Sequence, residues 1–183
     1  MSRLPYPDPS ELPEETRAFF EALPFKLNIH RMMASAPTCL RGYLSLGRAI
    51  LRKQALEARL RELTILRVAT LSRSDYERTQ HIPIARACGA TDADIDAMER
   101  GDPAALDARA ALVLRFTDEC VRDVRVSDGT FEQARKIFSA REIAELTLTI
   151  GFYMMTARFL ETLAVDAEPP AKDMAESFRQ STR

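Results

Sequence analysis

One stretch near the middle of the chain is apolar on nearly every side when it is drawn as a helix. Leu63 to Leu71 reads LTILRVATL, and Arg67 is its one charged residue. A helix with so little polar surface has to be covered by other elements on several sides. We therefore expect a helix over Leu56–Leu71 at the centre of a multi-helix fold.

The rest of the sequence also favours helices, because apolar alternation is rare and no Asn-Gly or Asp-Gly turn joins two β-rich runs. Thr91 is a predicted N-cap, and Thr130 with Gln133 and Ser139 with Glu142 form predicted capping boxes. The pattern predicts an all-α fold with helices over about 13–23, 27–35, 39–53, 56–71, 74–88, 91–99, 105–122, 130–138 and 139–164.

A chain of 183 residues that is 46% hydrophobic fits one domain with a real core. We expect residues 1–27 to form an N-terminal extension with one helix, residues 28–169 the main domain and residues 170–183 a C-terminal tail. The formal net charge is -1, from 26 basic and 27 acidic residues, so a nucleic-acid partner is not expected.

The N-terminus lacks the apolar stretch of a signal peptide. The longest uncharged run lies between Glu145 and Arg158 and is shorter than the roughly 20 residues of a membrane span. We expect a cytoplasmic protein with no membrane partner. Cys39, Cys88 and Cys120 are too widely spaced for a disulfide framework or a zinc site, and with only two histidines we expect neither a metal nor a cofactor.

Two helices are strongly apolar, at about Leu56–Leu71 and Glu142–Ala164. A chain of this size has few other elements to cover both of them. The pattern favours a homo-oligomer, in which partner subunits supply the missing cover. The alternative is that both helices lie at the centre of one monomer.

Ser74, Glu77, His81, Ile84 and Cys88 follow one another at spacings of 3, 4, 3 and 4, so they share one stripe of a helix. Ile84 and Cys88 are typical core residues, and the stripe should therefore face inward. A carboxylate and an imidazole one turn apart in a partly buried setting can form an acid–base pair. Glu77 and His81 are thus candidate catalytic residues.

Structural explanations exist for the same residues. Ser74 and Glu77 also fit a capping box, and Glu–His pairs occur on solvated helix faces. Arg67 is either a buried partner of Glu62 or Glu77, or an anchor for an anionic substrate. Cys88 fits a small buried hydrophobe, and Tyr153 a core residue, better than reactive groups.

The segment from Glu62 to His81 reads ELTILRVATLSRSDYERTQH. It resembles the core of the carboxymuconolactone decarboxylase and alkylhydroperoxidase D-like family, which reads E-L-x-I-L-x-V-x-x-L-x-x-C-x-Y-C-x-x-x-H in its peroxidase-type members. The matching residues are Glu62, Leu63, Ile65, Leu66, Val68, Leu71, Tyr76 and His81. The resemblance extends over about residues 28–169 and implies an alkylhydroperoxidase D-like helical bundle, as a trimer or hexamer.

The two redox cysteines of the peroxidase-type members are replaced here by Ser74 and Glu77. These side chains cannot cycle through a disulfide, so dithiol peroxidase turnover is not expected. The decarboxylase-type branch, which also lacks the Cys pair, implies cofactor-independent acid–base chemistry, of the lyase or isomerase type, on a small anionic lactone or unsaturated acid.

In this branch His81 would be the general acid or base. Glu77 would orient it or share its proton, and Glu62 would complete the relay. Arg67, Ser74 and Tyr76 would contact the substrate. We expect Glu62 and His81 to lie within direct or one-water reach, because a short connection favours antiparallel packing of their helices. The alternatives are an alkylhydroperoxidase or peroxiredoxin-like antioxidant protein and a non-catalytic oligomeric binding protein.

Overall fold

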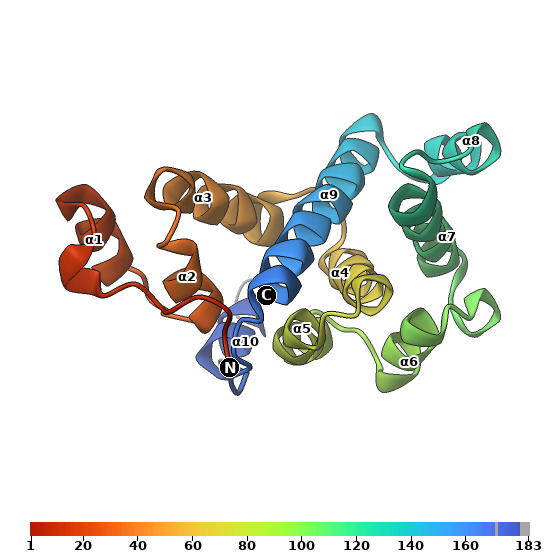
Figure 1. Cartoon of the computed structure of the whole chain (residues 1–183). Helices are drawn as coiled ribbons and strands as arrows, with labels where there is room; N and C mark the ends of the chain where they lie inside the picture. Colours follow the sequence, from red (N-terminus) through yellow and green to blue (C-terminus); the bar gives the residue numbers. More distant parts are fainter. Residues whose placement is uncertain (171, 180–183) are drawn as a thin grey trace.

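The computed structural model describes residues 1–170 and 172–179, and every regular element in these ranges is helical (Figure 1). Two short 3₁₀ helices, η1 (Pro9–Glu11) and η2 (Pro103–Ala105), accompany the α-helices. The α-helices are α1 (Glu14–Glu21), α2 (Asn28–Met33), α3 (Pro37–Lys53), α4 (Ala58–Ser72), α5 (Asp75–Ala87), α6 (Asp92–Arg100), α7 (Ala108–Asp123), α8 (Asp128–Ile137), α9 (Ala140–Leu163) and α10 (Lys172–Arg179). The predicted all-α fold is confirmed.

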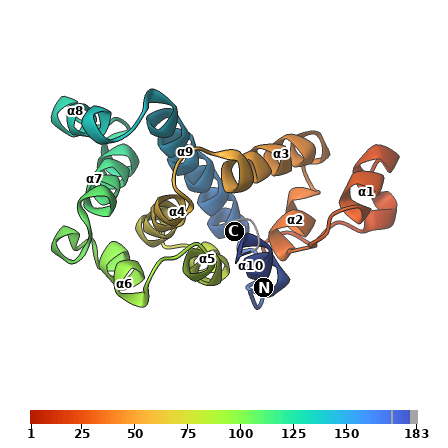
Figure 2. The same ribbon diagram turned by 180° about the vertical axis from the view of Figure 1, so that it is seen from behind.

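Helix α4 lies at the centre of the molecule, between α5, α6, α7 and α9 (Figures 1 and 2). Its residues from Leu60 to Ala69 are all buried, as the apolar segment predicts. Because one monomer covers α4 completely, this helix gives no support to an oligomer. For α4 the structure therefore agrees with the alternative, in which the helix lies at the centre of one monomer.

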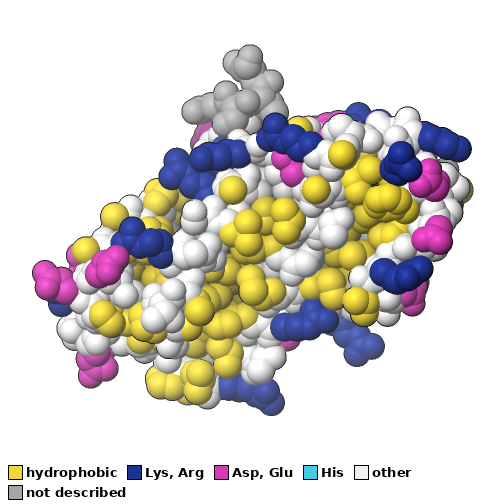
Figure 3. Space-filling model, turned by 90° about the horizontal axis from the view of Figure 1, so that it is seen from above, with side chains coloured by type: hydrophobic (Ala, Val, Ile, Leu, Met, Phe, Trp, Pro, Cys, Tyr) yellow, Lys and Arg dark blue, Asp and Glu magenta, His cyan; other side chains and the backbone are white. Residues whose placement is uncertain are grey.

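Helix α9 is covered on one side only. It packs on α3, α4, α7 and α8, whereas Leu148 and Met155 are 57% and 49% exposed. Hydrophobic side chains also gather on the face of the molecule that Figure 3 shows. By length and composition α9 is the one helix in residues 1–170 and 172–179 that could cross a membrane, but half of its apolar window is buried, as in a core helix.

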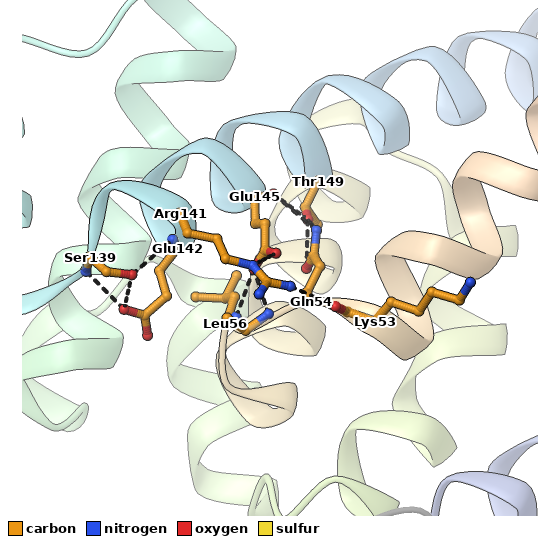
Figure 4. Close-up of polar contacts among 9 residues, drawn as sticks. Lys53, Gln54, Leu56, Ser139, Arg141, Glu142, Glu145 and Thr149 are labelled. Atoms are coloured by element: carbon orange, nitrogen blue, oxygen red, sulfur yellow. Dashed lines mark hydrogen bonds and ion pairs between the residues drawn. The ribbon is translucent and has the colours of Figure 1, made fainter.

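The connection from α3 to α4 is fastened to α9 (Figure 4). The Glu145 carboxylate accepts hydrogen bonds from the backbone N–H groups of Ala55 and Leu56, at 2.6 and 2.9 Å. Arg141 binds Glu145 at 2.8 Å and donates to the carbonyl of Lys53. The last of these bonds satisfies a carbonyl at the end of α3, and together they fix α3, α4 and α9 relative to one another.

A tight turn joins α4 to α5. Arg73 takes a left-handed conformation, with φ of 55°, and the Ser74 N–H donates to the Ala69 carbonyl at 2.9 Å. The chain therefore reverses within two residues, and α5 packs along α4. The inward stripe is found as predicted, since Ser74, Glu77, His81 and Ile84 are all buried.

Two of the predicted caps are found and two are wrong. Thr91 and Ser139 form complete capping boxes. Helix α8 is capped by Ser127 instead of Thr130, because the Thr130 hydroxyl is buried and donates to Glu119 at 2.6 Å. Ser74 makes no side-chain cap either.

The two ends of the chain close one side of the molecule. The Arg3 N–H donates to the Leu163 carbonyl at 2.8 Å, and Glu168 accepts from the Asn28 N–H at 2.6 Å and from the Tyr76 hydroxyl. The predicted tail contains α10, which packs on α5, and Ala171 and residues 180–183 of that tail lie outside the described residues.

Candidate active site

Glu62 and His81 form a direct pair in the centre of the molecule. The His81 Nδ1 atom lies 2.8 Å from Glu62 Oε2, and Glu62 is completely buried. Glu62 lies in the second turn of α4 and His81 at the middle of α5, and the packing of the two helices brings them to the same depth. This contact matches the distance that the sequence predicts.

Arg61 completes a buried trio that the sequence analysis missed. Its Nε atom donates to Glu62 Oε1 at 3.0 Å. Burial opposes ionisation of Glu62, but the hydrogen bond and charge of His81 and the charge of Arg61 outweigh it and lower the pKa of Glu62. The ionised carboxylate accepts from both neighbours. The signal for Arg61 was its place directly before Glu62 in a buried helix.

The tautomer of His81 follows from this arrangement. Ionised Glu62 is an acceptor only, so His81 donates from Nδ1 whether the ring is neutral or charged. In the neutral ring the Nε2 atom has a free lone pair, and it has no hydrogen-bond partner within residues 1–170 or 172–179. Glu62 thus orients a basic nitrogen, which is the role of the second group in an acid–base dyad.

His81 and Glu77 line a cavity of about 1070 Å³. Its walls come from α1 to α3, α5, α9 and α10, so it does not lie between α4 and α5 as the sequence predicted. Glu62 lies behind His81 and does not line the cavity. Apolar side chains dominate the walls, among them Phe25, Leu44, Leu51, Phe152, Leu160 and Phe178.

Glu77 is a carboxyl group without a partner. It is 2% exposed, and neither of its oxygen atoms makes a hydrogen bond in the described part of the chain. Burial and the negative charge of Glu161 raise its pKa well above the ordinary value. The group is therefore a neutral acid that can donate its hydrogen. It does not orient His81, because Glu62 does.

Tyr153 is a second cavity residue whose part in the site the sequence analysis missed. Its ring meets the His81 ring edge-on, with 5.0 Å between the centroids. Burial and the charges of Glu62 and Glu77 raise the pKa of its phenol well above the ordinary value. Its hydroxyl therefore stays protonated beside His81. In the sequence it was indistinguishable from the core residues of its apolar helix.

Arg67 lies on the other side of α4 and does not reach the cavity. It binds Asp118 through two hydrogen bonds of 2.5 and 2.8 Å and donates to the carbonyls of Met98 and Glu99. This corrects the prediction that Arg67 holds a substrate carboxylate, because its donors are occupied within the protein.

The other two predicted substrate contacts are also placed differently. Ser74 lines a separate cavity of about 300 Å³, together with Arg78 and Glu99, and its buried hydroxyl has no partner in the described residues. Tyr76 lines the large cavity, but its hydroxyl donates to Glu168 and accepts from the Ile29 N–H. Its ring can contact a ligand, whereas its hydroxyl holds the chain ends together.

The thiols are poorly suited to redox chemistry. Cys88 lies 3.8 Å from Arg61 Nη2, and burial raises the pKa of its thiol to about 11. Burial also raises the pKa of Cys120. No group of three His, Cys, Asp or Glu side chains that could hold a metal ion occurs in residues 1–170 and 172–179.

Two solved structures share this fold over nearly their whole length. One is described as an alkylhydroperoxidase D core and an uncharacterized peroxidase-related protein from Ralstonia eutropha JMP134. It has a TM-score of 0.77 and 19% identity, over 97% of this chain and 94% of that one. The other, an uncharacterized peroxidase-related protein from Silicibacter sp. TM1040, has a TM-score of 0.74 and 22% identity, over 100% and 96%.

A third similar structure is a protein of unknown function from Agrobacterium tumefaciens. It has a TM-score of 0.67 and 21% identity, over 74% of this chain and 94% of that one. These likenesses show an alkylhydroperoxidase D-like fold. No curated protein matches the chain in sequence.

A family model matches part of the sequence. Residues 37–119 match the model of the carboxymuconolactone decarboxylase family. This segment runs from α3 to α7 and contains Glu62, Glu77 and His81. The chain thus contains a carboxymuconolactone decarboxylase-like segment within an alkylhydroperoxidase D-like fold, and it has no Cys-x-x-Cys pair.

Proposed function

We propose that the protein is a cofactor-independent acid–base enzyme, of the lyase or isomerase type, that acts on an unsaturated or lactone acid. The observation that carries the proposal is the 2.8 Å contact between Glu62 and His81, at a cavity where the neutral carboxyl group of Glu77 has no partner. A free base and a free acid thus face one apolar space.

The chemistry needs only proton transfer. His81 Nε2 removes a proton from the carbon next to a substrate carbonyl, and the resulting imidazolium is stabilised by Glu62. The electron pair of the broken C–H bond moves to the carbonyl oxygen, to which Glu77 donates a hydrogen bond. Return of the proton from His81 to another carbon completes an isomerisation. An apolar setting strengthens each of these charge interactions.

A peroxidase function has less support. Disulfide cycling requires two neighbouring thiols, and none of Cys39, Cys88 and Cys120 is paired with another. A single-cysteine reaction requires a thiolate, whereas the pKa of Cys88 is raised to about 11. Two of the similar structures are described as peroxidase-related, and that description applies to those proteins.

The test is a screen of unsaturated lactone acids and keto acids in deuterated water. Mass spectrometry detects deuterium uptake at carbon, and a coupled assay detects release of CO₂. For any active compound, His81→Ala should lower kcat/KM by about 10³-fold, within the 10²–10⁴ range of general acid–base catalysis. Glu62→Gln should lower it less, because Nε2 remains in place.

The matched control is the triple variant of Cys39, Cys88 and Cys120 to Ser, which should keep full activity. Turnover of an alkyl hydroperoxide with a thiol reductant that is lost in Cys88→Ser would replace this proposal with a single-cysteine mechanism. Full activity of His81→Ala would reduce the Glu62–His81 pair to a structural contact.

We also propose that the protein works as a homo-oligomer. The support is the exposed apolar side of α9, with Leu148 and Met155 seven residues apart on one stripe. Light scattering at micromolar concentration should give a multiple of the 20.6 kDa chain mass. Leu148→Glu should reduce that mass, and a wild-type reading of 20.6 kDa would contradict the idea.

A further inference from the structure

The cavity beside His81 is built for a larger ligand than a simple lactone. Its volume of about 1070 Å³ stands at the upper end of the roughly 300–1,000 Å³ that hold drug-sized ligands. The apolar walls provide no hydrogen bonds over most of this space. A ligand that fills it needs an apolar body.

More positive than negative side chains line the cavity. Four cationic side chains line it, Arg41, Arg48, Arg52 and Lys53, against the single carboxyl group of Glu77. Burial raises the pKa of that carboxyl, which favours its neutral form. Burial also lowers the pKa of His30, another lining residue. The cavity is therefore positive at neutral pH, and the positive charges all come from α3.

The three arginines follow one side of α3, seven and four residues apart, a spacing that keeps them on one helix face. Arg41 already binds Glu15, at 3.1 Å. Arg52 donates to the Ser177 carbonyl at 3.0 Å and stacks on the Phe178 ring, 3.6 Å from its centroid. Both of these arginines hold other helices in place against α3.

Arg48 differs from these two arginines. It is exposed and lines the cavity, and it makes no hydrogen bond or ion pair with residues 1–170 or 172–179. It lies between Leu44 and Leu51, which both line the apolar wall. A guanidinium at the edge of an apolar space suits a ligand with an anionic end and an apolar body.

We infer that the cavity binds an amphipathic organic acid, with its apolar body along α3 and α9 and its anionic group at Arg48. The group that reacts then lies at the other end, beside Glu77 and His81. Only this last placement rests on the proposed function. Arg48 thereby takes the substrate-anchoring role that the sequence assigned to Arg67.

Binding is measurable without turnover. The chain has no Trp and four Tyr, and three of these, Tyr43, Tyr76 and Tyr153, line the cavity. Tyrosine fluorescence therefore reports on its contents. The probes are octanoate and octan-1-ol. They share an apolar body and differ in charge, and neither absorbs light at the wavelengths of tyrosine fluorescence.

Octanoate should bind saturably and up to about fivefold tighter than octan-1-ol, the ratio expected of one exposed charge pair. Arg48→Gln should remove that preference and Arg48→Glu should reverse it, while both leave the affinity for octan-1-ol within twofold. Arg135→Glu is the control, because Arg135 lies on α8 away from the cavity, and it should change neither affinity.

Absence of saturable binding, equal affinity for the two probes, or equal losses in the Arg48 and Arg135 variants would overturn the inference. Octanoate binding that depends on Arg48, in a protein that exchanges no proton with any compound of the screen, would leave the inference standing and remove the proposed function. Turnover of a compound of the screen by a protein that shows no saturable octanoate binding would do the opposite.

Discussion

Both sides of α4 carry buried polar side chains, but the hydrogen bonds of these side chains are satisfied on one side and incomplete on the other. On the side of α6 and α7, Arg67 meets Asp118 and two carbonyls, and every donor that faces the protein is used. On the side of α5, the chain of contacts that begins at Arg61 and Glu62 ends at His81 Nε2, and Glu77 nearby has no partner.

This difference distinguishes polar groups that stabilise the fold from polar groups that could bind a ligand. A buried polar group without a partner lowers stability, so a folded protein carries few of them. The saturated Arg67 cluster holds α4, α6 and α7 together. The unsaturated groups beside His81 leave hydrogen-bonding capacity for something outside the chain. Variants on each side can test the contrast.

The largest effect is expected on the saturated side. Arg67→Gln leaves two carbonyls without their donor and Asp118 with only Arg122, at 3.4 Å, and should lower the free energy of unfolding by about 3 kcal/mol. Arg78→Gln is the control, since Arg78 binds Glu99 in the same two-point manner at the surface and should cost less than about 1 kcal/mol. Urea denaturation measures both, and equal losses would remove the contrast.

Gly101 tests how tightly the same cluster is held. It ends α6 with φ of 71°, and a Cβ atom there would lie 2.7 Å from Arg67 Nη2. Gly101→Ala should therefore lower the free energy of unfolding by more than the about 1–2 kcal/mol that a left-handed residue costs. A loss within that range that is unchanged in the Arg67→Gln background would show that Arg67 is free to move.

A smaller effect of opposite sign is expected on the unsaturated side. Glu77→Met replaces an unpaired carboxyl group with an apolar side chain of similar length, and should raise the free energy of unfolding by about 1 kcal/mol. Any activity found in the screen should fall in the same variant. Destabilisation by Glu77→Met would mean that the carboxyl group has a structural partner.

The last effect concerns the pH dependence of stability. The folded chain holds the Glu77 proton more tightly than the unfolded chain, in which the pKa of Glu is about 4.3. Below that pH the group is neutral in both states. As the pH rises from there toward the raised folded pKa, the unfolded chain releases the proton and the folded chain does not, so the free energy of unfolding falls. The stability of Glu77→Gln relative to wild type should therefore increase with pH above about 4.3. Parallel pH profiles in thermal denaturation would show that the pKa of Glu77 is ordinary.

Local patterns predicted much of the fold and the centre of the site. The apolar run of α4 required burial on all sides, and the spacing on α5 required Glu77 and His81 to face inward. The short connection then brought Glu62 to His81. Each of these inferences needs only helix geometry and a few neighbouring residues.

The errors concern partners that are distant in sequence. Arg67 meets Asp118, and no pattern near either residue relates them. The cavity wall combines α3 with α10, more than one hundred residues later, so Arg48 had no visible role. The Ser74–Glu77 capping box was wrong for another reason: burial, which the four-residue motif does not encode, keeps both side chains from the N–H groups of the first turn.

The unpaired carboxyl group of Glu77 also has a consequence for the history of the lineage. Many single substitutions at this position should improve folding. Selection for activity would keep the acid only where the reaction uses it. Sequencing of a mutated library, selected first for folding and then for the native activity, should enrich apolar residues at position 77 in the first step and Glu in the second.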